Sequence, residues 1–271
     1  MNQLIRTEWL KIKYYRAFWW IITLTALTYP GINYISYNIY LNIIERKDMA
    51  SKLAKMIMGT PFSFPEVWHT TAYFSSFFVF IPSIVVIMFI TNEYTFKTHR
   101  QNIIDGWSRN QFMTSKLIDV AMTTLMITAL YTIVCLIIGF ININDKMGSI
   151  WQQSYFIGLF ALQTFAQLSL AFLIGILVRK AFIALGIFLF YYLILENTMV
   201  LYAKFKLNDI GRFLPFEVSD RLIPYPAFFN KVSPDSYQAA LDAIPYHVIY
   251  SIILTAIVWF ISFRVYNRRD L

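Results

Sequence analysis

The strongest constraint on the fold is a series of long apolar segments. Each is close to the length of about 20 residues that a helix needs to cross the core of a bilayer. None shows the alternation of a membrane β-barrel. We therefore expect an all-α polytopic membrane protein with six transmembrane helices in a single domain, residues 1–271. The segments are Phe18–Tyr40, His69–Ile90, Leu117–Phe140, Tyr155–Val178, Ala181–Tyr202 and Tyr246–Phe263, with Pro30 and Pro82 as tolerated kinks.

The composition excludes an ordinary soluble enzyme and a disordered chain. Hydrophobic residues make up 58% and charged residues 14% of the 271 residues, whereas soluble domains are about 25% charged. A soluble fold of this size could not cover that much apolar surface. The single cysteine, Cys135, lies in an apolar run and excludes an intrachain disulfide or a CxxC site.

The charges predict the orientation. With six spans, one side holds 13 Lys/Arg and 5 Asp/Glu, and the other holds 10 of each, so the whole net charge of +8 lies on one side. By the positive-inside rule that side is cytoplasmic, and both termini are inside. The positive charge thus indicates orientation and contact with anionic membrane lipids, with no role in binding nucleic acid.

The N-terminal segment, residues 1–17, is predicted to be an amphipathic helix at the cytoplasmic surface. Ile5, Trp9 and Ile12 share one helix face, and Arg6 and Lys13 flank it.

The cytoplasmic loop 91–116 is predicted to contain a short helix at about residues 99–105. Thr98 with Gln101, and Ser108 with Gln111, have capping-box spacing, and Gly106 between them suits a helix end. A second helix would then run into the third span.

The short helix carries Ile103, Ile104 and Trp107, which have apolar surface to bury. A partner protein or the chain's own spans could cover them, and we favour the partner.

The largest external insertion is Ala203–Pro245. It contains five prolines and several aromatic residues, so it is too apolar for a free loop and too broken for a further span. Short re-entrant helices or a small cap would fit, because irregular backbone at membrane depth must be buried or line a cavity.

The chain lacks the sequence patterns of common catalytic sites. It has no GxxxxGK[ST], HExxH or GxSxG. Glu66 and His69 could share a helix face, but zinc needs three or four ligands. We therefore expect no catalytic residue, no metal site and no enzymatic activity on this chain.

Ionisable residues in the spans are scarce, and Asp119 and Glu196 stand near span ends. Glu196 is the sharper candidate, because it precedes the external insertion and could pair with Lys204 or Lys206 or meet a cationic substrate. Polar and aromatic residues in spans usually serve helix packing and interfacial belts. They could also line a path for an amphipathic substrate, with Tyr34, Tyr37, Gln163, Gln167, Tyr191 and Glu196 as candidates.

The whole layout resembles the permease subunits of ABC-2-type ABC transporters. The segment EWLKIKYYRAFWW resembles that family's connecting helix, and NEYTFKTHRQNIIDGWSRNQFMTSKL resembles its cytoplasmic signature. Lys97 stands where the family often has glycine. The motif positions are Glu93, Thr98, Arg100, Ser108, Arg109 and Lys116.

The resemblance implies a half-transporter in a bacterial cytoplasmic membrane that exports an amphipathic peptide, drug or lipid-like molecule. It implies a second permease copy or a related permease, and a separate ABC ATP-binding subunit that holds ATP and Mg²⁺, so this chain needs no cofactor. A coupling helix at 99–109 and the N-terminal helix would contact that subunit. The contact residues would be Arg100, Ile103, Ile104, Trp107, Arg109, Arg6 and Trp9.

Three alternatives stay open. A stand-alone secondary transporter predicts carboxylates at the membrane centre or matched broken helices. An intramembrane enzyme predicts convergent His, Glu or Asp residues within the spans. A membrane scaffold or assembly protein is compatible with the sequence.

Overall fold

The computed structural model describes residues 2–45, 58–142, 149–226 and 234–269, together with Met49, Lys52 and Phe228, with side chains from Glu8 onward. In these residues the chain is helical and contains no strand. The elements are α1 (Asn2–Tyr14), α2 (Arg16–Ile44), α4 (Val67–Ser76), α5 (Phe80–Thr95), α6 (Thr98–Ile104), α7 (Arg109–Ile141), α8 (Phe156–Val178), α9 (Ala181–Phe190), η1 (Tyr191–Leu195), α10 (Glu196–Lys206), η2 (Ile210–Phe213), α11 (Pro215–Asp220) and α12 (Pro234–Arg268).

Four helical stretches within the described residues are long and apolar enough to cross a membrane: α7, α8, Ala181–Lys206 and α12. The pair α4 and α5 makes a fifth if it counts as one bent span. Helix α2 covers the predicted first span, but its Tyr, Thr and Asn residues make it less apolar and it stays outside this set. The chain therefore has the character of a multi-pass membrane protein, and the count of six spans stays a prediction.

The bend between α4 and α5 has a local cause. The two helices meet at 50° across residues 77–79, and Pro82 follows in the first turn of α5. Proline has no N–H and its ring clashes with the carbonyl four residues earlier, here that of Phe78. The predicted proline kink thus becomes a full break, whereas Pro30 lies inside the single helix α2.

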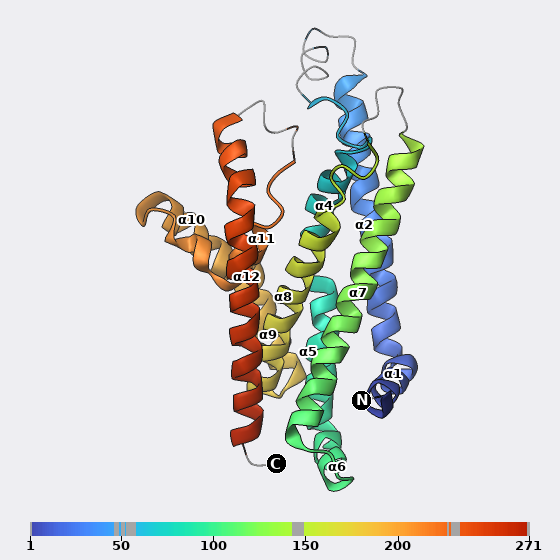
Figure 1. The fold of residues 1–271 in the computed structure, drawn as a ribbon, viewed down its shortest axis with the longest axis vertical. Helices are drawn as coiled ribbons and strands as arrows, with labels where there is room; N and C mark the ends of the chain where they lie inside the picture. Colours follow the sequence, from blue (N-terminus) through green and yellow to red (C-terminus); the bar gives the residue numbers. More distant parts are fainter. Residues whose placement is uncertain are drawn as a thin grey trace.

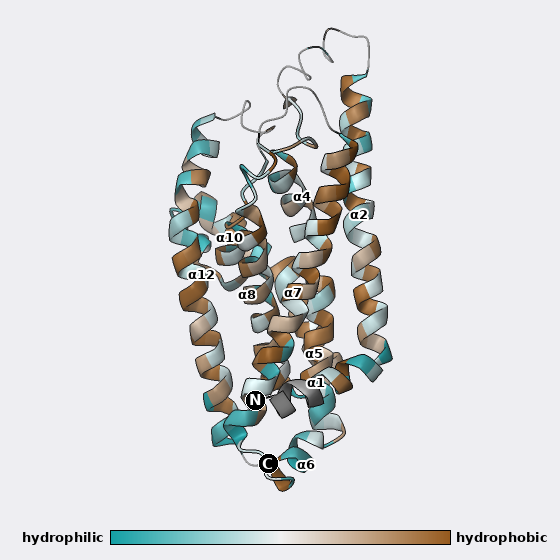
Figure 2. Cartoon of the chain, turned by 45° about the vertical axis from the view of Figure 1, so that its right-hand side comes forward, coloured by the Kyte–Doolittle hydropathy of each residue, from teal (hydrophilic) through white to brown (hydrophobic). Residues whose placement is uncertain are grey.

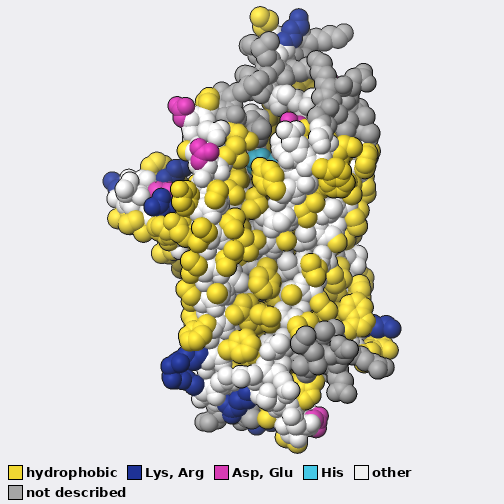
Figure 3. Space-filling view, viewed as in Figure 1, with side chains coloured by type: hydrophobic (Ala, Val, Ile, Leu, Met, Phe, Trp, Pro, Cys, Tyr) yellow, Lys and Arg dark blue, Asp and Glu magenta, His cyan; other side chains and the backbone are white. Residues whose placement is uncertain are grey.

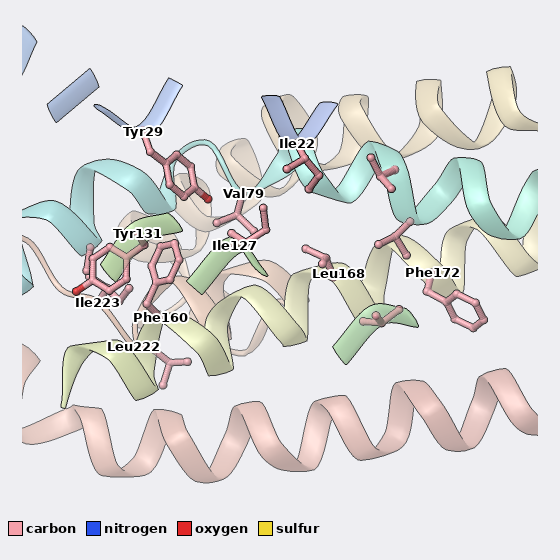
Figure 4. Packing of buried hydrophobic residues seen from close by; sticks show 14 of the residues in the cluster. Ile22, Tyr29, Val79, Ile127, Tyr131, Phe160, Leu168, Phe172, Leu222 and Ile223 are labelled. Carbon is pink, nitrogen blue, oxygen red and sulfur yellow. The ribbon is translucent and has the colours of Figure 1, made fainter. Parts of the chain in front are cut away.

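Helix α8 lies at the centre of the bundle (Figure 1), and it packs against α5, α7 and α12. Its Phe160 stacks on Tyr131 of α7 (Figure 4), and its Phe172 stacks on Trp259 of α12. Trp259 Nε1 also donates a hydrogen bond of 2.9 Å to Ser169 Oγ. This core fixes the positions of the outer helices.

The outer surface matches a lipid environment. Apolar side chains cover the middle of the face seen in Figure 3, and hydrophilic residues gather toward the ends (Figure 2). On α9, for example, Phe182, Ile187 and Phe190 are exposed. Such an area of exposed apolar surface would not be stable in water.

The two ends of the chain lie at the same end of the bundle as α6 (Figure 1). At this end, Arg109 at the start of α7 joins α7 to the end of α12, because its guanidinium donates to the carbonyls of Asn267 and Arg269 at 2.6 and 2.9 Å. We call this the α6 end of the bundle, and the opposite end the outer end.

Gly175 allows α8 to approach α5 closely. A Cβ there would clash with Ile90 Cγ2, and the β-branched Ile90 has little freedom to move away. Gly158, on the same helix, has open space around it.

We expect Gly175→Ala to lower the free energy of unfolding by about 1–3 kcal/mol, because it overpacks the α5–α8 contact. Gly158→Ala is the matched control and should be neutral or slightly stabilising, since alanine is the better helix former. Thermal unfolding of the purified variants in detergent measures both. Equal melting temperatures for the two variants would contradict the close packing described here.

Candidate functional site

The loop between α5 and α7 forms a compact, well-capped hairpin that carries α6. Asp105 ends α6, and the N–H groups of Gly106 and Trp107 bond to the carbonyls of Ile103 and Asn102 at 3.1 and 3.0 Å, as in a Schellman motif. Gly106 has a φ of 98°, which only glycine adopts easily. The predicted short helix and glycine break are confirmed.

The two capping boxes predicted in this loop have different outcomes. The Ser108 side chain accepts from the Gln111 N–H and the Gln111 side chain accepts from the Ser108 N–H, so this box is confirmed. The other is wrong, because Thr98 is already inside the helix and Lys97 precedes it. Thr98 Oγ1 instead donates a hydrogen bond to the Glu93 carboxylate, which ties α6 to α5.

Lys97 adopts a left-handed conformation with a φ of 57°. This conformation crowds the Cβ of any residue except glycine. A glycine at this position would therefore relieve the crowding.

We expect Lys97→Gly to stabilise the fold by about 0.5–1 kcal/mol, because it relieves the crowded Cβ while adding some entropy to the unfolded chain. Lys97→Ala removes the same charge but keeps Cβ, so it should give no such gain. Unfolding of the two variants in detergent separates the steric effect from the charge effect. A gain for the alanine variant as large as that for glycine would refute the explanation.

A buried charge cluster joins α1, α5 and α7 at the α6 end. It consists of Glu8, Lys11, Glu93, Lys116 and Asp119. Lys116 Nζ lies 2.6 Å from Glu8 Oε2, 2.9 Å from Glu93 Oε1 and 3.2 Å from Asp119 Oδ2. Lys11 Nζ lies 3.1 Å from both Glu8 and Glu93. The cluster therefore connects the amphipathic helix and, through Glu93 and Thr98, the short helix α6 to the bundle.

The electrostatics of the cluster depend on Lys116. Its side chain is only 3% exposed, and all three carboxylates around it are buried. Burial alone would raise the pKa of Glu8, but the attraction of Lys116 and Lys11 outweighs burial and lowers it. Removing one partner of such a group leaves uncompensated buried charge.

We expect Lys116→Met to destabilise the folded chain by about 3–5 kcal/mol, because three buried carboxylates lose their common cation. Lys11→Met is the matched control: it removes a lysine that contacts two of the same carboxylates but is 34% exposed. Its cost should be at most about 1 kcal/mol. Chemical unfolding in detergent compares them, and similar costs would contradict the central role of Lys116.

The residues predicted to contact a partner through the loop differ in their surroundings. Arg100 and Ile104 are exposed, and Ile104 is 77% exposed at the tip of the molecule. Ile103 is half-buried against the core. Trp107 is half-buried, with Lys11 Nζ 6.0 Å from its ring centre, and Arg109 binds the end of α12. Only Arg100 and Ile104 thus present free side chains on α6.

The N-terminal helix was also predicted to contact a partner. Trp9 on α1 is 43% exposed. The side chain of Arg6 lies outside the described residues.

Helix α11 lies between the middle of the bundle and its outer end (Figure 1), and Glu196 holds its start. Its Oε1 accepts hydrogen bonds of 2.7 Å from the backbone N–H groups of both Phe216 and Glu217. The π-helical turn η1 directly precedes Glu196 within the long helix that begins at Ala181. Such turns often mark functional positions in helices. The predicted pairing with Lys204 or Lys206 does not form, since Glu196 binds backbone amides instead.

A second carboxylate, that of Asp220, joins α11 to the central helix α8. Asp220 Oδ1 accepts hydrogen bonds from Gln163 Nε2 and Gln167 Nε2 of α8, at 2.8 and 2.7 Å. Burial raises the pKa of Asp220 to about 7.

A cavity of about 300 Å³ lies between α4, η1, α10 and α11, and we call it the outer pocket. Acidic and aromatic side chains line it. They include Tyr73, Phe77, Tyr192, Glu196, Phe216, Glu217 and Asp220.

The structure brings some of the predicted substrate-path residues together. Glu196 lines the outer pocket, Tyr191 adjoins it on η1, and Gln163 and Gln167 hold Asp220. The α2 candidates lie elsewhere. Tyr34 is 67% exposed, and Tyr37 packs edge-on against Phe62 at 5.3 Å.

Sequence reasoning missed Glu217 and Asp220, which lie in the insertion that was expected to dip or form a cap. The only signal was that these two acidic residues follow closely after Pro215 and Phe216.

The structure also shows what His69 does, which the sequence had placed beside Glu66 as an incomplete metal-binding pair. His69 Nε2 donates to the carbonyl of Pro224 at 2.7 Å, and the ring stacks on Phe156 with centroids 4.1 Å apart. The described residues contain no group of three or more possible metal ligands.

A protein-family model matches residues 41–271 and carries the description "Protein of unknown function (DUF2705)". The chain belongs to the DUF2705 family. The DUF2705 region contains the outer pocket, α6 and the residues Glu93, Lys116 and Asp119, whereas Glu8 and Lys11 precede it. No curated protein matches the chain.

Proposed function

We propose that this chain is the permease subunit of an ATP-driven transporter of the ABC-2 type. It would export an amphipathic molecule with energy from a separate ATP-binding subunit, which holds ATP and Mg²⁺. The observation that supports this most directly is α6, a short capped helix at the tip of the molecule with Ile104 and Arg100 exposed. A free apolar side chain beside a cation, on a rigid loop, is suited to a protein groove.

The charge cluster supplies a route from such a contact into the bundle. Thr98 on α6 binds Glu93 on α5, and Glu93 shares Lys116 with Glu8 of α1. A displacement of α6 by a partner would therefore act on three helices together, because buried ion pairs resist separation. This arrangement favours energy coupling over an isolated pore.

The membrane topology is part of the proposal. Six spans would consist of α2, the bent pair α4 and α5, α7, α8, Ala181–Lys206 and α12, in a bacterial cytoplasmic membrane. The excess of Lys and Arg on the side of α6 favours cytoplasmic termini. The segment after Lys206, which contains η2 and α11, would then form the external re-entrant segment. A second copy or a related permease would complete the transporter.

We expect Ile104→Asp to abolish co-purification of a P-loop ATPase with the tagged chain from its native membrane, because it puts a charge into the centre of the contact. Ile104→Leu, which keeps an apolar side chain of equal size, should retain the ATPase. The measurement is a mild-detergent pull-down with mass spectrometry and an ATPase assay.

Lys180→Asp is a second control, since it introduces the same acidic side chain on an exposed turn between α8 and α9, outside α6 itself. If the wild-type chain purifies without any ATPase, the proposal fails and a stand-alone transporter or a scaffold becomes the better interpretation. If an ATPase is retained by Ile104→Asp, the role of α6 is refuted.

A further inference from the structure

The outer pocket combines negative charge with an aromatic lining. Three of its lining residues, Glu196, Glu217 and Asp220, are acidic, and none of its described lining residues is Lys, Arg or His. The pocket lies within a largely apolar bundle, where each charge is poorly screened. The lining as a whole therefore attracts a cation.

The burial and the hydrogen bonds of Glu196 support the same conclusion. The residue is 3% exposed, and its Oε1 is used by the two α11 amides. Its second oxygen, Oε2, accepts no hydrogen bond of normal geometry in the part of the chain that the structure describes, and the nearby Tyr191 hydroxyl is the side-chain group that interacts with the carboxyl. An unpartnered buried oxygen on an acid is costly unless a ligand or a proton compensates it.

The other two carboxylates differ in how far they are already neutralised. Glu217 Oε1 binds Arg221 Nε at 2.6 Å, and Arg221 also holds Asp209 with two hydrogen bonds of 2.7 and 2.8 Å. Asp220 has only the uncharged amides of Gln163 and Gln167. Glu196 and Asp220 are thus the two carboxyl groups in the pocket that no described cationic side chain neutralises.

The aromatic rings define the kind of cation. Tyr192 and Phe216 meet edge to face with ring centroids 5.1 Å apart, and Tyr73 and Phe77 do so at 5.0 Å. Ring faces attract weakly hydrated organic cations such as quaternary ammonium groups. A small metal ion would leave most of a cavity of about 300 Å³ unfilled and would gain nothing from the rings.

We propose that the outer pocket binds an organic cation, an ammonium group that carries an apolar substituent. The charge would lie by Glu196 and Asp220, and the substituent against Phe77 and the neighbouring rings. Binding is a property of this chain alone, whereas the identity of the bound cation as the transported substrate rests on the proposed function.

The test is isothermal titration calorimetry of the full-length chain in detergent micelles with benzyltrimethylammonium, whose charge does not depend on pH. Empty micelles provide the blank, and 3-phenylpropionate serves as an anion of similar size. We expect saturable binding of the cation and none of the anion.

Glu196→Gln and Asp220→Asn remove each charge but keep an oxygen that can accept the same hydrogen bonds. Each should weaken binding about tenfold or more. Asp242→Asn is the matched control, because Asp242 is an exposed carboxylate on α12 that does not line the pocket. The Asp242→Asn variant should bind the cation with the affinity of the wild type.

Phe77→Ala provides a variant that keeps both charges and the α11 contacts, since Phe77 is 52% exposed in the break between α4 and α5. It should also weaken binding of the cation. Equal binding of cation and anion, or unchanged affinity in both Glu196→Gln and Asp220→Asn, would overturn the proposal. The ATPase pull-down distinguishes the permease proposal from the cation-binding proposal. If an ATPase co-purifies but no cation binds, only the cation-binding proposal fails.

Discussion

The contact on which the α6 end of this protein depends is a single ammonium group surrounded by three buried carboxylates. Lys116 binds Glu8, Glu93 and Asp119, and these residues come from α1, α5 and α7. Buried ions are expensive to separate, so the three helices are held in one arrangement by charge as well as by packing. Because Glu93 also holds Thr98, the position of α6 is set by the same group of charges.

Apolar packing holds the other helices around α8. Helix α8 is surrounded by other helices, and glycine and aromatic residues allow its close contacts with α5 and α12. The outer helices bury far less of their apolar surface within the chain. A buried central helix with exposed apolar outer helices suits a lipid bilayer. There, tight van der Waals contact rather than exclusion of water holds helices together.

Local features of the fold could be predicted from the sequence, and long-range features could not. Ser108 with Gln111, and Gly106, act within a few residues of one another, so their spacing was sufficient. Thr98 was misjudged because α6 already begins at this residue, and its hydroxyl donates to Glu93 of the preceding helix. The amide partners of Glu196 lie 20 residues further on, at a place that only the folded insertion creates.

The π-helical turn before Glu196 links the geometry of the outer pocket to helix register. A turn with one extra residue changes the direction of every following side chain by about 100° around the axis. The same extra residue thus decides whether this carboxylate faces the amides of α11 or the lipid. If the π-helical turn moved along the helix past Glu196, the side chain of Glu196 would rotate away from α11. This one movement would release α11 and remove a carboxylate from the pocket, and no helix would have to shift as a whole.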